Sequence, residues 1–233
     1  FFDMYKIYEK QRDSEKVQKH LGQYLKAWGA QGGVDRQIIA RVKLGELLWR
    51  YSCGDPGVNG ACIKLERVRA RAVKEVKLKG KKKVVAAEIN MKQCGPDTKS
   101  RITVFARKPG LAQEAQNHFK TALSAYGGGA AVAKVPGRSD ADKASRTMEM
   151  MYAVSQARFA QAEQAYEAFL KIAFPEGLTF DPGKKDENKK KVEESQKRFA
   201  KWLDDKAKAL DTAANGYREV ITMKVAHWAI AAS

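Results

Sequence analysis

The sequence predicts a mainly α-helical protein that carries a small basic β-hairpin insertion. On both sides of residues 62–108, apolar residues recur with the 3.6-residue period of amphipathic helices, whereas inside that segment they alternate as in strands. The same segment holds 15 Lys or Arg against four Asp or Glu, while the whole chain of 233 residues has a formal net charge of +17. We therefore expect a helical scaffold that is interrupted by a basic module of different structure.

Two helices are predicted before the insertion. Residues 13–28 form an amphipathic stripe for which Asp13 or Ser14 is a suitable N-cap. Residues 34–52 form a second stripe of the same kind. Because the connection through Gly32 and Gly33 is short, the two helices are expected to form an antiparallel hairpin.

Two further helices are predicted after the insertion. One runs from Pro109, which fits the first turn of a helix, to Tyr126. The next is long, with Ser139 as its N-cap and Phe174–Pro175 beyond its end. Apolar or small residues recur in it at intervals of four and three, a spacing typical of coiled-coil packing. This seam comprises residues 148, 152, 155, 159, 162, 166, 169 and 173.

A last helical region begins near residue 186, with a possible bend at Asn215–Gly216. Its expected apolar face comprises Phe199, Leu203, Leu210, Tyr217, Ile221 and Trp228. We expect it to pack antiparallel against the long helix before it. The chain then divides into a helical region (1–61 and 109–138), the basic insert (62–108), and a long antiparallel helical pair that leads into a further repeat (139–233).

The insert is expected to contain two paired strands, near residues 63–71 and 101–107, because β-branched and alternating residues gather there. Between them lies a lysine-rich stretch centred on residues 79–83, expected to be exposed. Strands hold arginines in fixed positions, from which they can pair bidentately with carboxylate or phosphate. The candidate partner-binding residues are Arg67, Arg69, Arg71, Lys81, Lys82, Lys83, Arg101 and Arg107.

Several partners fit such a basic segment. Lysine runs are often only solvated loops, but a dense positive charge also attracts acidic protein surfaces or anionic polymers. Nucleic acid is the alternative. It is less favoured because Phe105 is the one aromatic residue in the segment, and single strands are commonly bound by base stacking. No helix-turn-helix or zinc-finger pattern indicates duplex recognition either.

Three cysteines, Cys53, Cys62 and Cys94, lie in or beside the insert. Free thiols and one disulfide with a thiol left over are both compatible with this placement. If a disulfide forms, we expect Cys53 with Cys62, because an antiparallel pairing puts Cys94 at the other end of the ladder. The histidines are scattered singly and no C-x-x-C pair exists, so no metal site is predicted.

No residue pattern predicts a reaction, a cofactor or a membrane span. The glycine run at 127–129 lacks phosphate-loop spacing, and no nucleophile motif is present. Glu163 and Glu167 are i,i+4 carboxylates, which we interpret as ordinary surface charge. The four tryptophans occupy amphipathic positions and are expected to pack in the core or between helices. The sequence thus predicts a protein that is not an enzyme.

Some predicted helix pairs carry a shared pattern of small and aromatic residues. It comprises Leu44–Gly45 with Leu48, then Ala115, Phe119 and Ala122, with a looser echo at Ala162, Tyr166, Phe169 and Pro175. This pattern resembles tetratricopeptide repeats. Small residues let helices approach, and the aromatic residue fills the groove between them. The basic insert separates the two halves of the first repeat, and the regular 34-residue period is absent.

The arrangement is also similar to large tetratricopeptide proteins of the cell envelope of gliding and predatory bacteria, through residues 33–39 and 225–232. This resemblance implies a periplasmic or envelope-associated scaffold that binds other proteins, with a cytoplasmic location as the alternative. It defines no functional residues. The chain begins with Phe1 and ends within an amphipathic pattern, so we expect it to be a fragment of a longer protein.

Overall fold

The computed structural model describes residues 2–29, 31–54, 61–69, 72–78, 81–87, 98–181 and 186–233. They form two compact units. The helical unit comprises residues 1–62 and 105–233, and the strand unit comprises Ile63–Val104. The strand unit is smaller than the predicted insert, since Phe105 to Lys108 belong with the helices.

The helical unit begins with three helices, α1 (Met4–Lys10), α2 (Ser14–Trp28) and α3 (Val34–Ser52). The short helix α1 was not predicted from the sequence. Helix α2 starts as expected, because the Asp13 carboxylate accepts a hydrogen bond of 3.0 Å from the backbone N–H of Lys16. The expectation for Trp28 was wrong, since its side chain is about half exposed (51%) at the end of α2.

Helix α4 (Pro109–Tyr126) packs against α3 and continues through two short 3₁₀ turns, η1 (Gly127–Gly129) and η2 (Val132–Lys134). The α3–α4 contact depends on Gly45, where an added Cβ would lie 2.7 Å from the Phe119 ring. Phe119 is buried, as are Ala115 and Ala122 on the same face of α4. The core therefore forms where the small residues of the two helices let them approach closely.

Helix α5 (Asp140–Lys171) joins this core to the rest of the unit. The Ser139 side chain caps it by accepting from the N–H of Asp142. Near its start, Arg146 donates from Nε to Asp35 of α3 at 2.9 Å, and Asp35 is almost fully buried. Met150 and Val154 are buried in the core, so one face of α5 belongs to the α3–α4 side.

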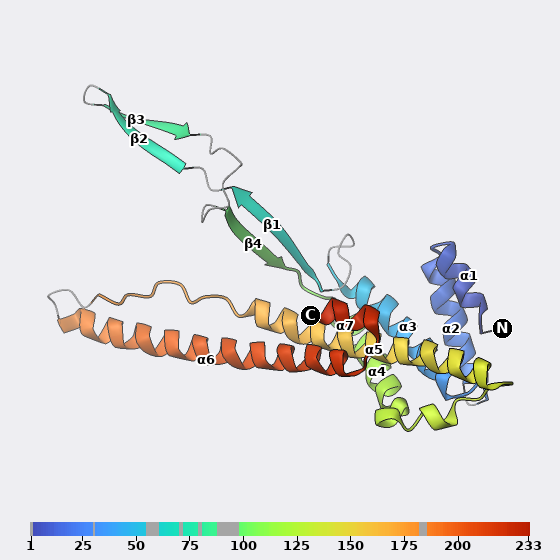
Figure 1. Cartoon of the computed structure of the whole chain (residues 1–233). Helices are drawn as coiled ribbons and strands as arrows, with labels where there is room; N and C mark the ends of the chain where they lie inside the picture. Colours follow the sequence, from blue (N-terminus) through green and yellow to red (C-terminus); the bar gives the residue numbers. More distant parts are fainter. Residues whose placement is uncertain are drawn as a thin grey trace. The chain divides into compact units, whose positions relative to one another are not determined.

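Helix α6 (Asp186–Thr222) lies antiparallel beside α5, as the sequence predicts (Figure 1). The predicted bend at Asn215–Gly216 is wrong, because α6 runs straight through it. Gly216 instead marks a close helix contact, where an added Cβ would lie 3.0 Å from the Cβ of Ala162. Because Gly216 has no side chain, α6 can approach α5 closely at this point.

The predicted apolar face of α6 was partly wrong. Leu203, Leu210 and Ile221 are exposed by 53%, 49% and 42%. Ala214 and the predicted Tyr217 are partly shielded. The other shielded residues of α6 alternate at intervals of three and four, one position away from the two leucines. They include residues 192, 195, 199, 202, 206, 209, 213, 216 and 220. Small and amphipathic residues therefore form much of this seam, which hydrophobicity alone did not identify.

Helix α6 ends at a turn in which Lys224 adopts a left-handed backbone conformation (φ 56°). A separate helix, α7 (Ala226–Ala232), follows, so the last helical region is not continuous to Trp228 as expected. The Trp228 ring lies 5.2 Å from that of Phe159 and 5.5 Å from that of Tyr152. No helix among the described residues is long and apolar enough to cross a membrane.

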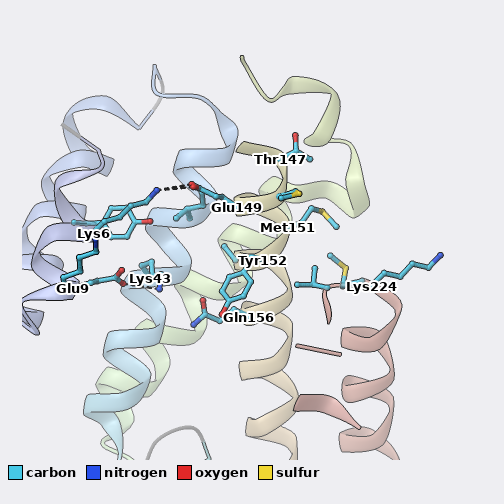
Figure 2. Close-up of a pocket in the computed structure, with 16 residues that line it drawn as sticks. Lys6, Glu9, Lys43, Thr147, Glu149, Met151, Tyr152, Gln156 and Lys224 are labelled. Atoms are coloured by element: carbon cyan, nitrogen blue, oxygen red, sulfur yellow. Dashed lines mark hydrogen bonds and ion pairs between the residues drawn. The ribbon is translucent and has the colours of Figure 1, made fainter. Parts of the chain in front are cut away.

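A groove of about 1040 Å³ opens between α1, α3, α5 and the α6–α7 turn. Figure 2 shows Lys6, Glu9 and Lys43 on one side of it and Lys224 on the other, with Tyr152 and Met151 of α5 between them. All of the lining residues belong to the helical unit.

The strand unit contains two antiparallel pairs instead of the one predicted hairpin. Strand β1 (Ile63–Arg69) pairs with β4 (Thr98–Val104), and β2 (Ala72–Leu78) pairs with β3 (Lys81–Ala87). The lysine-rich stretch predicted to be a loop therefore supplies the first residues of β3.

Candidate functional site

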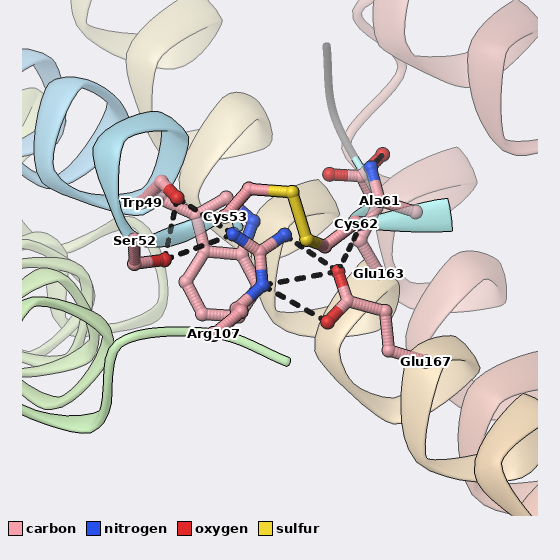
Figure 3. Close-up of a disulfide and its surroundings, with 8 residues drawn as sticks. All are labelled: Trp49, Ser52, Cys53, Ala61, Cys62, Arg107, Glu163 and Glu167. Atoms are coloured by element: carbon pink, nitrogen blue, oxygen red, sulfur yellow. Dashed lines mark hydrogen bonds and ion pairs between the residues drawn. A yellow bond between two sulfur atoms is a disulfide. The ribbon is translucent and has the colours of Figure 1, made fainter. Parts of the chain in front are cut away.

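The chain leaves the helical unit after Cys62 and re-enters it at Phe105, and a disulfide lies at this point (Figure 3). Cys53 directly follows α3 and is bonded to Cys62, the pair that the sequence analysis expected. Both cysteines are buried, and their Cα atoms are 5.6 Å apart, as is usual for a disulfide. Cys94 lies outside the described residues.

Arg107 lies beside this disulfide and corrects one of the predicted partner-binding positions. Strand β4 ends at Val104, and the Arg107 side chain is only 6% exposed. Its Nε donates to Glu167 at 2.9 Å, and its Nη1 donates to the Trp49 carbonyl at 2.6 Å. The guanidinium also lies 3.5 Å from the centre of the Trp49 ring. Arg107 is thus a structural residue inside the helical unit, where it is not available to a partner.

Glu163 and Glu167 were wrongly interpreted as surface charge. The Glu167 carboxylate is 3% exposed and accepts from the backbone N–H of Cys62 at 2.7 Å as well as from Arg107. One turn earlier on α5, Glu163 accepts from the N–H of Ala61 at 3.0 Å. The i,i+4 spacing places both carboxylates on one face of α5, where they hold the last two residues before β1. We call Trp49, Ser52, Cys53, Cys62, Arg107, Glu163 and Glu167 the junction cluster.

Glu163 is a member of the junction cluster with a strongly shifted pKa. Burial raises its pKa from the ordinary 4.5 to about 7, and the negative charge of Glu167 adds to the rise. The Ala61 N–H and the Arg107 charge act in the opposite direction. The cluster therefore combines a disulfide, a buried ion pair and a carboxyl group that titrates near neutral pH.

The remaining predicted binding residues lie in the strand unit, apart from Arg71, which is outside the described residues. The register pairs Arg67 with Ser100, Arg69 with Thr98, and Arg101 with Glu66.

The three predicted lysines are the first residues of β3. Lys82 lies directly opposite Lys77 of β2, whereas Lys81 and Lys83 lie opposite Leu78 and Val76. A like-charge pair at opposite positions of an antiparallel ladder is destabilising. The register thus brings lysines together at the end of β2 and the start of β3.

Neither a related family nor a bound ligand identifies the function of this protein. No protein-family model, curated protein or solved structure matches the chain. Across the described ranges, no group of three or more His, Cys, Asp or Glu side chains could hold a metal ion. The tetratricopeptide resemblance stays a prediction.

Proposed function

We propose that this protein is a non-catalytic scaffold of the bacterial envelope that binds other proteins, and that its strand unit contacts an acidic partner surface. The observation that carries this proposal is that much of the positive charge lies in one unit, whereas the described buried core lies in the other. Residues 63–104 hold 13 Lys or Arg against four Asp or Glu, while the buried core lies in the helical unit. A dense positive charge of this kind attracts acidic surfaces.

The junction cluster supports the same proposal. The disulfide and the Arg107–Glu167 pair hold the two points at which the chain passes from the helical unit to the strand unit. A fixed pair of ends reduces the conformational freedom that binding would otherwise remove. Structural disulfides persist in oxidising compartments such as the bacterial periplasm, which favours an envelope location over a cytoplasmic one.

Binding of two labelled probes tests the proposal. A polyglutamate peptide stands in for an acidic protein surface, and a DNA duplex of arbitrary sequence represents the nucleic-acid alternative. Fluorescence anisotropy would measure the affinity of the full chain for each over a series of salt concentrations. The test variant carries Arg67→Gln, Arg69→Gln, Lys82→Gln and Lys83→Gln. The matched control removes four exposed charges from α6 through Lys190→Gln, Lys191→Gln, Lys197→Gln and Lys201→Gln.

We expect the strand variant to bind polyglutamate about tenfold more weakly, a loss of about 1.4 kcal/mol, and the α6 control to bind like the wild type. Equal losses in both variants would show attraction to net charge alone and would contradict the proposal. Tight DNA binding with a steep salt dependence, without polyglutamate binding, would favour the nucleic-acid alternative. Mass mapping of the non-reduced protein from cell fractions would test the compartment, since a cytoplasmic protein with free Cys53 and Cys62 contradicts it.

A further inference from the structure

The groove of the helical unit contains the part of the α5 seam that α6 does not cover. Along the covered part, the ring of Phe159 lies 5.6 Å from that of Tyr217, and Ala162 contacts Gly216. Helix α6 ends at Thr222, but the four-and-three spacing continues toward the N-terminus of α5 through Tyr152 and Met148. Met148 is 71% exposed and Tyr152 is 39% exposed. His227 and Trp228 of α7 contact one side of the Tyr152 ring. The surface patterned to pack against a helix therefore extends beyond the end of α6, and Met148 leaves it open to solvent.

The composition of the groove fits the apolar face of a helix. Its apolar lining comes from four segments and includes Tyr5, Ile39, Met148, Met151, Tyr152 and Met223. Methionine side chains are flexible and polarisable, and they are favoured where a surface must adapt to a helix laid into it. The high exposure of Met148 shows that the groove is open to solvent, as docking of a helix requires.

The charges at the rim indicate the sign of the ligand. Lys6 is paired with Glu149, and Lys43 with Glu9, so these four side chains compensate one another (Figure 2). Lys10 of α1 and Lys224 after α6 also line the groove, and neither has an acidic partner among the described residues. The rim thus has uncompensated positive charge on two different elements, which would attract an acidic helix.

We propose that this groove is a docking site for an amphipathic α-helix of a partner protein, with apolar anchors at i, i+3 or i+4 and i+7 and with acidic flanking residues. The anchors pack on Met148, Met151 and Tyr152, in line with the end of α6. The acidic flanks lie near Lys10 and Lys224. This interaction surface belongs to the helical unit and is independent of the strand unit and its proposed acidic partner.

Three designed peptides test the proposal against the full chain. The first is an amphipathic helix with leucine anchors and glutamate flanks. The second has lysine flanks in place of glutamate, and the third has the composition of the first in scrambled order. Isothermal titration calorimetry measures affinity, and the methyl NMR signals of the methionines locate the site. We expect the signals of Met148, Met151 and Met223 to move on addition of the first peptide, with less change at Met150, which is buried in the core.

Two sets of variants connect binding to the groove. We expect Met148→Asp to weaken binding of the glutamate-flanked peptide about 10- to 30-fold, because it places a charge where an apolar anchor packs. Leu203→Asp is the matched control, since Leu203 is also exposed but lies on α6 outside the groove. Lys10→Glu with Lys224→Glu should weaken the glutamate-flanked peptide about threefold to tenfold and strengthen the lysine-flanked one.

Several outcomes would overturn the proposal. Equal binding of the scrambled peptide, or equal effects of Met148→Asp and Leu203→Asp, would show that the groove does not recognise a helix. Light scattering that finds a dimer dispersed by Tyr152→Asp would identify a second copy of the chain as the occupant. Binding of a small apolar dye in the groove without binding of any peptide would indicate a ligand pocket. None of these results depends on whether the strand unit binds polyglutamate.

Discussion

The helical unit and the strand unit differ in what they contribute. The helical unit contains buried side chains that stabilise the fold, whereas the strand unit carries much of the positive charge. In the helical unit, side chains such as Leu21, Ile38 and Phe119 are almost completely removed from water. The described residues of the strand unit form two antiparallel pairs, and an isolated two-stranded pair is marginally stable at best in water. The helical unit can therefore supply most of the free energy of folding, while the strand unit carries more than half of the net positive charge.

The largest expected effect tests where the core lies. Phe119→Ala should lower the free energy of unfolding by about 3–5 kcal/mol, because the ring is 1% exposed and fills the space that Gly45 leaves. Urea unfolding followed by circular dichroism measures this change. Phe174→Ala is the control, since Phe174 is 55% exposed, and it should change stability by no more than about 0.5 kcal/mol. Similar losses in the two variants would contradict the assignment of the core.

The second prediction tests the junction cluster. Glu167→Ala should cost about 3–5 kcal/mol, because it leaves the Arg107 guanidinium buried without its carboxylate. Replacing both residues by methionine should recover much of that loss, since no unpaired buried charge remains. Asp204→Ala removes an exposed pair with Lys208 and should leave the urea midpoint unchanged. If the double methionine variant were as unstable as Glu167→Ala, the loss could not come from an unpaired buried charge. The ion pair itself would then stabilise the fold, against our interpretation.

These two predictions also mark what the sequence could and could not supply. Helices α3 and α4 were predicted with the bounds they have, because amphipathic periodicity and end signals such as Pro109 act locally. The role of Arg107 could not be predicted in this way, since it depends on Glu167, 60 residues further along the chain. The one available signal was the i,i+4 pair of Glu163 and Glu167, which has no distinct meaning until a partner is known.

The α5–α6 contact shows a second limit. The spacing correctly predicted part of the α5 seam, including Phe159 and Ala162, but Met148 and Tyr152 at its start are exposed. The predicted α6 seam was displaced by one residue at Leu203 and Leu210, which indicated the wrong face. Helices that approach closely select small residues at the contact, as with Gly216 against Ala162. On α6, leucines are therefore exposed where small residues are buried, which is the opposite of what hydrophobicity predicts. The turn after Thr222 and the separate helix α7 were not predicted either.

The third prediction concerns pH and Glu163. Its pKa in the folded protein is about 7, above the ordinary value of 4.5, so folding favours the protonated form. The stability associated with this proton is fully present below about pH 4.5 and is lost as the pH rises through about 7. At 1.36 kcal/mol for each pKa unit, reduced for partial exposure, we expect a loss of about 1–2 kcal/mol between pH 5 and pH 8.

Glu163→Gln should remove this pH dependence, since the amide oxygen can still accept from the N–H of Ala61. Urea unfolding of the wild type and the variant at the two pH values measures the difference. Glu193→Gln, at an exposed position on α6, is the matched control and should follow the wild type. A variant that loses stability over this range as steeply as the wild type would show that Glu163 is not the group responsible.

The smallest expected effect is also the most direct test of the comparison between the units. The Phe105 N–H donates to the Cys62 carbonyl at 2.9 Å, so the two ends of the strand unit meet as they would across a tight turn. Replacing Ile63–Val104 by Asn-Gly should therefore preserve the helical circular dichroism and the Cys53–Cys62 bond. Because a shorter connection lowers the entropy cost of closure, the replacement should not lower the stability of the helical unit. Polyglutamate binding should be lost in the same variant. If most of the helix were lost instead, the strand unit would be part of the folding core, and the division of roles between the two units would be wrong.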